Sequence, residues 1–326
     1  MLFRSTASEL FTGLRRSWQA GLLDLVLNFL PGALLAVLLG WGVVGAMVMG
    51  GVTYISSSGI AAKVITDLGR IGNRETPVIL SILVFEDLAM AIYLPVLTAT
   101  LAGVSFLVGL QTVGISLAVV TIVLLVALRH GHHVSKAVHS ENSEVFLLNL
   151  LGAALLVAGL ASAMQVSAAV GAFMLGIAIS GATAHSATRI LEPLRDLFAA
   201  IFFVVFGLNT DPATIPPVLG WALLLAIVTA ATKMITGIWA AKRAGIGRPG
   251  RFRAGAALIA RGEFSIVIAG LAVASGVVSA ELAALATAYV LIMAVTGPLA
   301  AKFVEPVVAM LLRPAKPPAV RTADGL

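Results

Sequence analysis

Residues 81–94 read SILVFEDLAMAIYL and place two adjacent acids, Glu86 and Asp87, in the middle of an apolar run. A helix needs about 20 apolar residues to cross a bilayer, and the run over residues 77–99 is long enough. Ionisable groups at bilayer depth are costly and are functional candidates by default. Two neighbouring carboxylates are not both ionised cheaply unless a cation lies close to them. The stretch therefore predicts a membrane protein with a charged site inside the membrane.

The composition of the whole chain agrees with a membrane protein. Of its 326 residues, 60% are hydrophobic and 11% are charged. Soluble proteins carry about 45–50% apolar residues and about 25% charged ones, so a water-soluble enzyme is excluded. The chain contains no cysteine, which excludes disulfides and thiolate metal sites. No cofactor is predicted, because the sequence has no phosphate-binding loop and no dinucleotide fingerprint.

Continuous apolar runs predict an all-α polytopic membrane protein with about ten transmembrane helices. The expected spans are residues 20–39, 42–61, 77–99, 104–128, 145–163, 167–184, 194–209, 217–240, 254–274 and 281–312.

The basic residues predict how these spans are oriented. Nineteen of the 21 lysines and arginines lie toward one side of the membrane, and the two others, Lys233 and Arg261, fall inside spans. Lysine and arginine collect on the cytoplasmic side of membrane proteins, so we expect both termini to lie in the cytoplasm. The expected location is the inner (cytoplasmic) membrane of the cell. The net charge of +6 is thereby explained without a nucleic-acid partner.

Lys233 is the expected counter-charge of the acid pair. At 1.5 Å per helical residue, Glu86 lies about 14 Å and Lys233 about 10 Å from the cytoplasmic ends of their helices. A lysine side chain covers that difference, so the two are expected to meet. One further acid, Asp24, is placed near the end of its span. A buried ion pair that only fixes helix packing is the alternative interpretation.

Two spans are interrupted by polar residues. Ser56, Ser57, Ser58 and Gly59 interrupt the span over 42–61, and Arg261-Gly262-Glu263 interrupts the span over 254–274. A broken helix survives in a membrane only where it faces protein or water, and its hydroxyls and free carbonyls are oxygen ligands for a hard cation. A packing patch of small residues is the alternative for the serines. For the second break, a local Arg261–Glu263 pair is favoured over a direct role in the ion path.

The two breaks occupy equivalent places in two groups of three spans with opposite orientation. This arrangement is typical of inverted-repeat transporters. The expected division is a cytoplasmic segment (1–19), the first half of an ion-translocating core (20–99), a linker helix and cytoplasmic loop (100–143), partial scaffold and dimerisation helices (144–211), the second half of the core (212–312) and a disordered cytoplasmic tail (313–326).

Three stretches resemble the Kef-type branch of monovalent cation:proton antiporters in the sodium/proton exchanger superfamily. They are YISSSGIAAKVITDLGRIGNRETPVILSILVFEDLAMAIYLP, FFVVFGLNTDP and LIARGEFSIVIAGLA, in that order. The resemblance implies two crossing broken helices. It identifies Asp87 as the acid that binds cation and proton in turn, and Lys233 as the partner of Glu86. Ser57 and Ser58 match one break, and Arg261 and Glu263 match the other.

The resemblance also implies the function and the partners. We expect exchange of a monovalent cation, K⁺ rather than Na⁺, for H⁺ across a lipid bilayer, with Asp87, Ser57 and Ser58 as cation ligands. A homodimer is expected, with a separate cytoplasmic regulatory subunit as a further partner. Members usually have about thirteen helices, so the first three are expected to be missing from this chain. The alternatives are a gated cation channel and an N-terminally truncated, non-transporting fragment.

Overall fold

The structure is a computed structural model that describes residues 7–102, 131–163, 181–208 and 212–311, with a few isolated positions between 111 and 179. Its described elements are helical, with no strand among them. The helices are α1 (Ala7–Leu38), α2 (Gly42–Tyr54), α3 (Ser58–Asp67), α4 (Thr76–Leu101), α6 (Ser143–Ala163), α8 (Gly181–Leu208), the short η1 (Pro212–Thr214), α9 (Ile215–Arg243), α10 (Arg248–Ala257), α11 (Glu263–Ser275) and α12 (Ala280–Leu311).

Six segments of the described chain are long and apolar enough to cross a membrane. They are Trp18–Leu38, Gly42–Asp67, Thr76–Leu101, Ser143–Ala163, Ile215–Arg243 and Ala280–Met310. Each coincides with an expected span. The expected spans at 104–128 and 167–184 lie largely outside the described residues, and the one at 194–209 forms the last part of α8.

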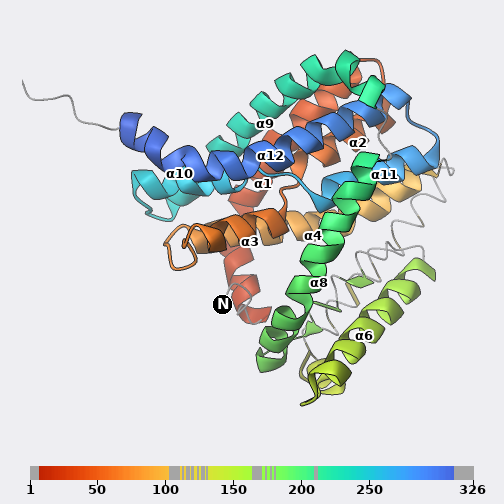
Figure 1. The fold of residues 1–326 in the computed structure, drawn as a ribbon, viewed down its shortest axis with the longest axis vertical. Helices are drawn as coiled ribbons and strands as arrows, with labels where there is room; N and C mark the ends of the chain where they lie inside the picture. The colour runs from red at the N-terminus through yellow and green to blue at the C-terminus, as the bar shows by residue number, and fades with distance from the viewer. Residues whose placement is uncertain are drawn as a thin grey trace, which may run out of the picture.

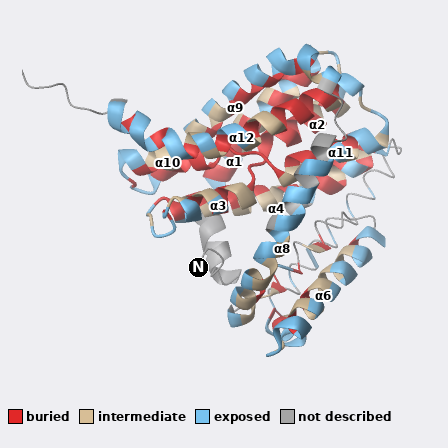
Figure 2. Cartoon of the chain, in the orientation of Figure 1, coloured by how far each residue is buried: buried red, intermediate tan, exposed pale blue. Residues whose placement is uncertain are grey.

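Most of the helices pack into one body, and its core lies where the N-terminal helices meet the C-terminal helices. Helices α1 and α2 pack against each other, and α9 packs against α1, α10 and α12. Figure 1 shows α9 and α12 beside α1 and α2, although about 200 residues separate them in the chain. The buried residues collect where these helices meet (Figure 2). The first and last parts of the chain therefore build a common core.

Small residues allow these helices to approach closely. A Cβ atom on Gly237 of α9 would collide with the backbone of Gly255 of α10, and one on Gly32 of α1 would collide with Met49 of α2. Close backbone approach at small residues is the usual way for helices to pack in a membrane. These glycines thus allow α2 to lie close against α1 and α10 to lie close against α9.

Helices α6 and α8 form a separate pair beside this body (Figure 1). A small core is formed by Phe146 and Leu150 of α6, Ala187 of α8 and Val138, which precedes α6. The outward side of α6 exposes leucines such as Leu155 and Leu156.

Both predicted helix breaks are present, at slightly different residues from those expected. The first consists of residues 55–57 between α2 and α3, and Ser58 already belongs to α3. The second consists of residues 258–262 between α10 and α11, so Glu263 is the first residue of a helix rather than part of the break. Helix α10 begins at Arg248, within a segment that was expected to be a cytoplasmic loop. Proline at its second position and glycine before it suit a helix start.

Candidate functional site

The two breaks cross and bond to each other in the centre of the molecule. The Ser57 amide donates to the Ala260 carbonyl at 2.9 Å, and the Ser56 hydroxyl donates to the Leu258 carbonyl at 2.9 Å. The approach is close enough to require glycine, since a Cβ atom on Gly262 would lie 2.6 Å from Ser57 Oγ. Backbone groups that leave a helix inside a membrane need such partners, because no water is there to replace them.

Arg261 satisfies the carbonyl ends of both broken helices. Its guanidinium donates to the Thr53 carbonyl near the end of α2, at 2.9 and 3.1 Å, and to the Leu258 and Ile259 carbonyls beyond α10, at 3.1 and 2.9 Å. The residue is fully buried. Helix C-termini leave carbonyls unpaired and carry negative partial charge, so a buried cation there is stabilised by both effects.

Glu263 contacts the N-terminal end of α3 at the crossing. Its carboxylate accepts hydrogen bonds from the Ser57 hydroxyl at 2.7 Å and from the Gly59 amide at 3.4 Å. These donors form the N-terminus of α3, where the helix dipole is positive. No ion pair joins Arg261 to Glu263 in the described part of the chain, so the predicted local pair is wrong. The two side chains instead compensate opposite helix ends.

The predicted contact between Lys233 and Glu86 is present. Lys233 Nζ lies 2.8 Å from Glu86 Oε1, and both side chains are fully buried. Glu86 also accepts a hydrogen bond from the Ser56 amide at 2.5 Å, and it lies 3.0 Å from the Ser56 hydroxyl, whose one proton is shared with the Leu258 carbonyl. Glu86 of α4 therefore links Lys233 of α9 to the first break.

Asp24 is a second partner of Lys233 that the sequence did not reveal. Its Oδ2 lies 2.7 Å from Lys233 Nζ, and its side chain is fully buried. Helix α1 begins at Ala7 rather than near residue 20, so Asp24 lies well inside a helix. The sequence pattern that could have indicated this role is a pair of polar residues in an apolar helix. Asp24 and Asn28 lie one turn apart on the same helix face. The Asn28 amide donates to Asp24 Oδ1 at 3.0 Å.

Asp87 follows Glu86 on α4 but has different surroundings. Its side chain is half-buried and makes no hydrogen bond or ion pair with the residues that the structure describes. Glu86 and Glu263 are its acidic neighbours. Asp87 is therefore a half-buried acid without a counter-charge among the described residues.

The serines proposed as cation ligands differ in how their hydroxyls are used. Ser57 Oγ donates to Glu263 and accepts from the Ile60 amide at 3.1 Å, which leaves one lone pair free. Ser58, the first residue of α3, is half-buried and has no side-chain hydrogen bond to any described residue. Both lie at the crossing.

A second charged cluster joins α10 and α12 to the connection between α3 and α4, and its Arg70, Glu75 and Arg253 lie outside the membrane-spanning segments. Arg253 of α10 contacts Glu75 at 2.5 Å and Glu305 of α12 at 3.2 Å, and Arg70 contacts Glu305 at 3.4 Å. Burial raises the pKa of Glu75, but the hydrogen bonds from Arg253 and Asn73 outweigh it and leave that pKa below its usual range. The cluster ties the loop before α4 to α10 and α12.

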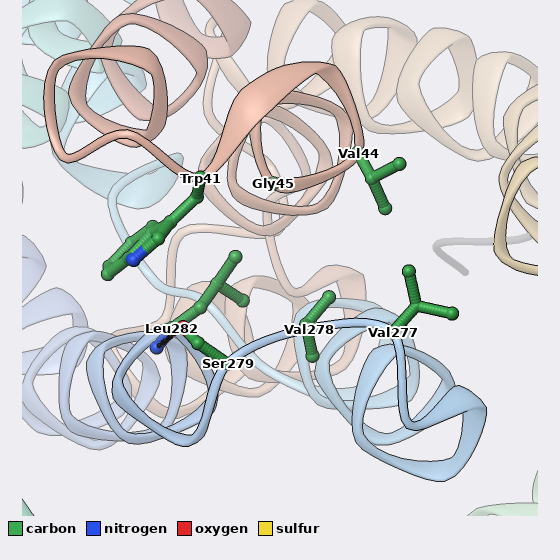
Figure 3. Close-up of a pocket in the computed structure, with 7 residues that line it drawn as sticks. All are labelled: Trp41, Val44, Gly45, Val277, Val278, Ser279 and Leu282. Atoms are coloured by element: carbon green, nitrogen blue, oxygen red, sulfur yellow. Dashed lines mark hydrogen bonds between the residues drawn. The ribbon is translucent and has the colours of Figure 1, made fainter.

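A small cavity of about 180 Å³ lies elsewhere, where the α1–α2 and α11–α12 connections meet. Figure 3 shows Trp41, Val44 and Leu282 among its mainly apolar lining. None of the buried acids lines it, so it is not the charged site.

Comparisons with known proteins identify the family of the chain. A family model described as sodium/hydrogen exchanger, transmembrane, matches residues 3–304. The protein is thus a multi-pass membrane transporter and not an enzyme. It belongs to the sodium/hydrogen exchanger family. Its relatives include K⁺/H⁺ antiporter subunits and Kef-type proteins, which confirms the resemblance noted in the sequence.

Three relatives illustrate the range of the family. The chain is 35% identical over 286 residues to the K(+)/H(+) antiporter subunit KhtU of Bacillus subtilis, a match covering 86% of this chain and 70% of that protein. It is 31% identical over 275 residues to the ammonium/H(+) antiporter subunit AmhT of Alkalihalophilus pseudofirmus, covering 82% and 70%. It is 26% identical over 282 residues to the Na(+)/H(+)-K(+) antiporter GerN of Bacillus cereus, covering 84% and 71%.

Proposed function

We propose that the protein exchanges a monovalent cation for protons at Asp87. The charged groups at the crossing differ in whether a protein group neutralises them, and this difference supports the proposal. Lys233 forms ion pairs with Asp24 and Glu86, and Arg261 donates its hydrogen bonds to helix-end carbonyls. Asp87 has no counter-charge among the described residues. An enclosed carboxylate is costly when it is ionised and alone.

Two charges can neutralise Asp87, a proton or a metal cation, and they compete for the same oxygens. If the site crosses the membrane barrier only when Asp87 is neutralised, it carries the cation in one direction and the proton in the other. This competition is sufficient to couple the two fluxes, so the same group serves both substrates. Binding energy that favours the loaded or protonated state over the empty ionised one drives the coupling.

The cation shell is completed by oxygen atoms from the crossing. Carboxylate, hydroxyl and carbonyl oxygens suit hard cations. The Ser58 hydroxyl has no partner among the described residues, and Ser57 Oγ has one free lone pair. Asp87, Ser57 and Ser58 are the proposed ligands. Glu86, held by Lys233, contributes negative charge beside them, and Arg261 and Glu263 support the crossing.

K⁺ is the proposed cation in preference to Na⁺. Oxygen ligands of these types bind both ions, so the preference comes from the relatives. KhtU is named for K⁺/H⁺ exchange and GerN for both ions, while AmhT is named for ammonium. Ammonium and K⁺ are monovalent cations of similar size, which favours the larger cation.

The proposed architecture is an inverted repeat. Helices α1–α4 and α9–α12 each hold a broken helix between long ones, and the two breaks cross. Broken helices in corresponding positions of two repeats mark the substrate site of many secondary transporters. In this proposal α6 and α8 belong to a scaffold that forms a homodimer in the inner membrane. Both termini lie in the cytoplasm, where a regulatory subunit binds, as the word subunit in two relatives' names suggests.

Proton flux in inverted membrane vesicles tests the function. The chain is produced in a host that lacks its own antiporters, and a pH gradient is established before K⁺ or Na⁺ is added. Exchange predicts that the added cation dissipates the gradient without a membrane potential being supplied. A channel would instead conduct the cation in the absence of any pH gradient and without proton movement. Dissipation that does not depend on the cation would contradict the proposal.

A further inference from the structure

The ammonium group of Lys233 is shared by two carboxylates from different helices. Asp24 of α1 lies 2.7 Å from Nζ and Glu86 of α4 lies 2.8 Å from it. All three side chains are fully buried. One positive charge therefore faces two acids, and it neutralises no more than one of them. If both acids are ionised, the group as a whole keeps one negative charge.

Asp24 is held more firmly than Glu86 to the helix that carries the lysine. Its Oδ1 accepts from Asn28, and the Asn28 Oδ1 accepts from Thr232 at 2.8 Å. Thr232 is the residue before Lys233, so hydrogen bonds close a loop between α1 and α9. The other partners of Glu86, by contrast, are the amide and hydroxyl of Ser56 in the first break. Lys233 thus has one partner anchored to its own helix and one attached to the crossing.

We propose that Asp24 is a positioning residue for ion exchange. It holds and neutralises the ammonium of Lys233, so that Glu86 keeps the negative charge that attracts a cation to the neighbouring Asp87. Without Asp24, Lys233 and Glu86 would form a neutral pair, and Asp87 would face a smaller negative potential. This inference rests on the proposed exchange at Asp87.

The nearly isosteric variant Asp24→Asn tests this role. The apparent KM for K⁺ is measured from K⁺-dependent proton flux in inverted vesicles, for wild type, Asp24→Asn and Asp24→Glu. We expect the KM of Asp24→Asn to rise about tenfold, which corresponds to about 1.4 kcal/mol of lost cation binding. The maximal rate is expected to change much less, and Asp24→Glu is expected to restore the KM because it restores the charge.

The control is Asp67→Asn, which removes the same charge from an exposed ion pair with Lys63 at the end of α3. It is expected to leave the KM unchanged. A KM of Asp24→Asn equal to that of wild type would overturn the proposal, as would a failure of Asp24→Glu to restore it. If Asp24→Asn does not reach the membrane, Asn28→Ala decides. This variant frees the anchored carboxylate, so it raises the KM if the proposal holds and leaves it unchanged if not.

Failure of this inference is distinguishable from failure of the proposed function. The variant Asp87→Asn is measured beside the others. If wild type exchanges K⁺ for protons and Asp87→Asn does not, the proposed function stands, and an unchanged KM in Asp24→Asn then refutes the role of Asp24 alone.

Discussion

Replacing Gly262 by alanine tests the crossing of the two breaks. The new methyl group would lie 2.6 Å from Ser57 Oγ and 2.8 Å from Ser57 Cβ, where unstrained contacts are 3.4 Å or longer. Ser57 is not free to retreat, because its amide bonds to Ala260 and its hydroxyl to Glu263. Overpacking of this kind costs about 1–3 kcal/mol. The variant should be less stable by that amount, and its exchange activity should fall because the crossing is displaced.

The matched control is Gly270→Ala on α11, where no described atom beyond the adjacent residues and nearby backbone of α11 itself lies within 4 Å of the new methyl group. In a helix interior alanine is favoured over glycine by about 1 kcal/mol, so this variant should be as stable as wild type or more so. Thermal unfolding of the purified proteins in detergent, with proton flux in vesicles, measures both effects. If Gly262→Ala matches Gly270→Ala in midpoint and flux, the two breaks do not meet as described.

Two further predictions concern charged groups around the site. Arg261→Lys should lower the free energy of unfolding by about 1–3 kcal/mol for each buried carbonyl left unpaired, because an ammonium does not span the carbonyls of both helices; an unchanged unfolding midpoint in detergent would show that the guanidinium is dispensable. Glu75 has a folded-state pKa below its usual value of 4.5, so its stabilising contribution is present above pH 4.5 and is lost as pH falls through the lower folded-state value. Glu75→Gln should therefore have a lower unfolding midpoint than wild type at pH 7, and its midpoint should fall less than that of wild type on acidification. Parallel profiles of unfolding midpoint against pH for the two proteins would contradict this.

Much of the core could be predicted because its signals are local. The apolar runs predicted the long helices, and polar residues inside them predicted the breaks. The contact between Lys233 and Glu86 followed from their similar depth along two helices. These predictions need only the rise of a helix and the cost of charge in a membrane.

The partners of Arg261 and Asp24 could not be predicted, because they depend on how distant helices cross. Arg261 and Glu263 are two residues apart, so proximity in the chain favoured a local pair. In the folded protein each meets the end of a helix about 200 residues away in sequence. Asp24 lies near the start of the span Trp18–Leu38, as expected, but the sequence did not indicate that Lys233 of α9 meets it there.

In the proposed exchange, the carboxylate of Asp87 binds the cation and the proton in turn. The most direct test is K⁺-dependent proton flux in inverted vesicles for wild type and Asp87→Asn, with Asp67→Asn as the control at an exposed acid. We expect flux in wild type and in the control, and none in Asp87→Asn at equal amounts of protein in the membrane. Flux in Asp87→Asn at the wild-type rate would contradict it.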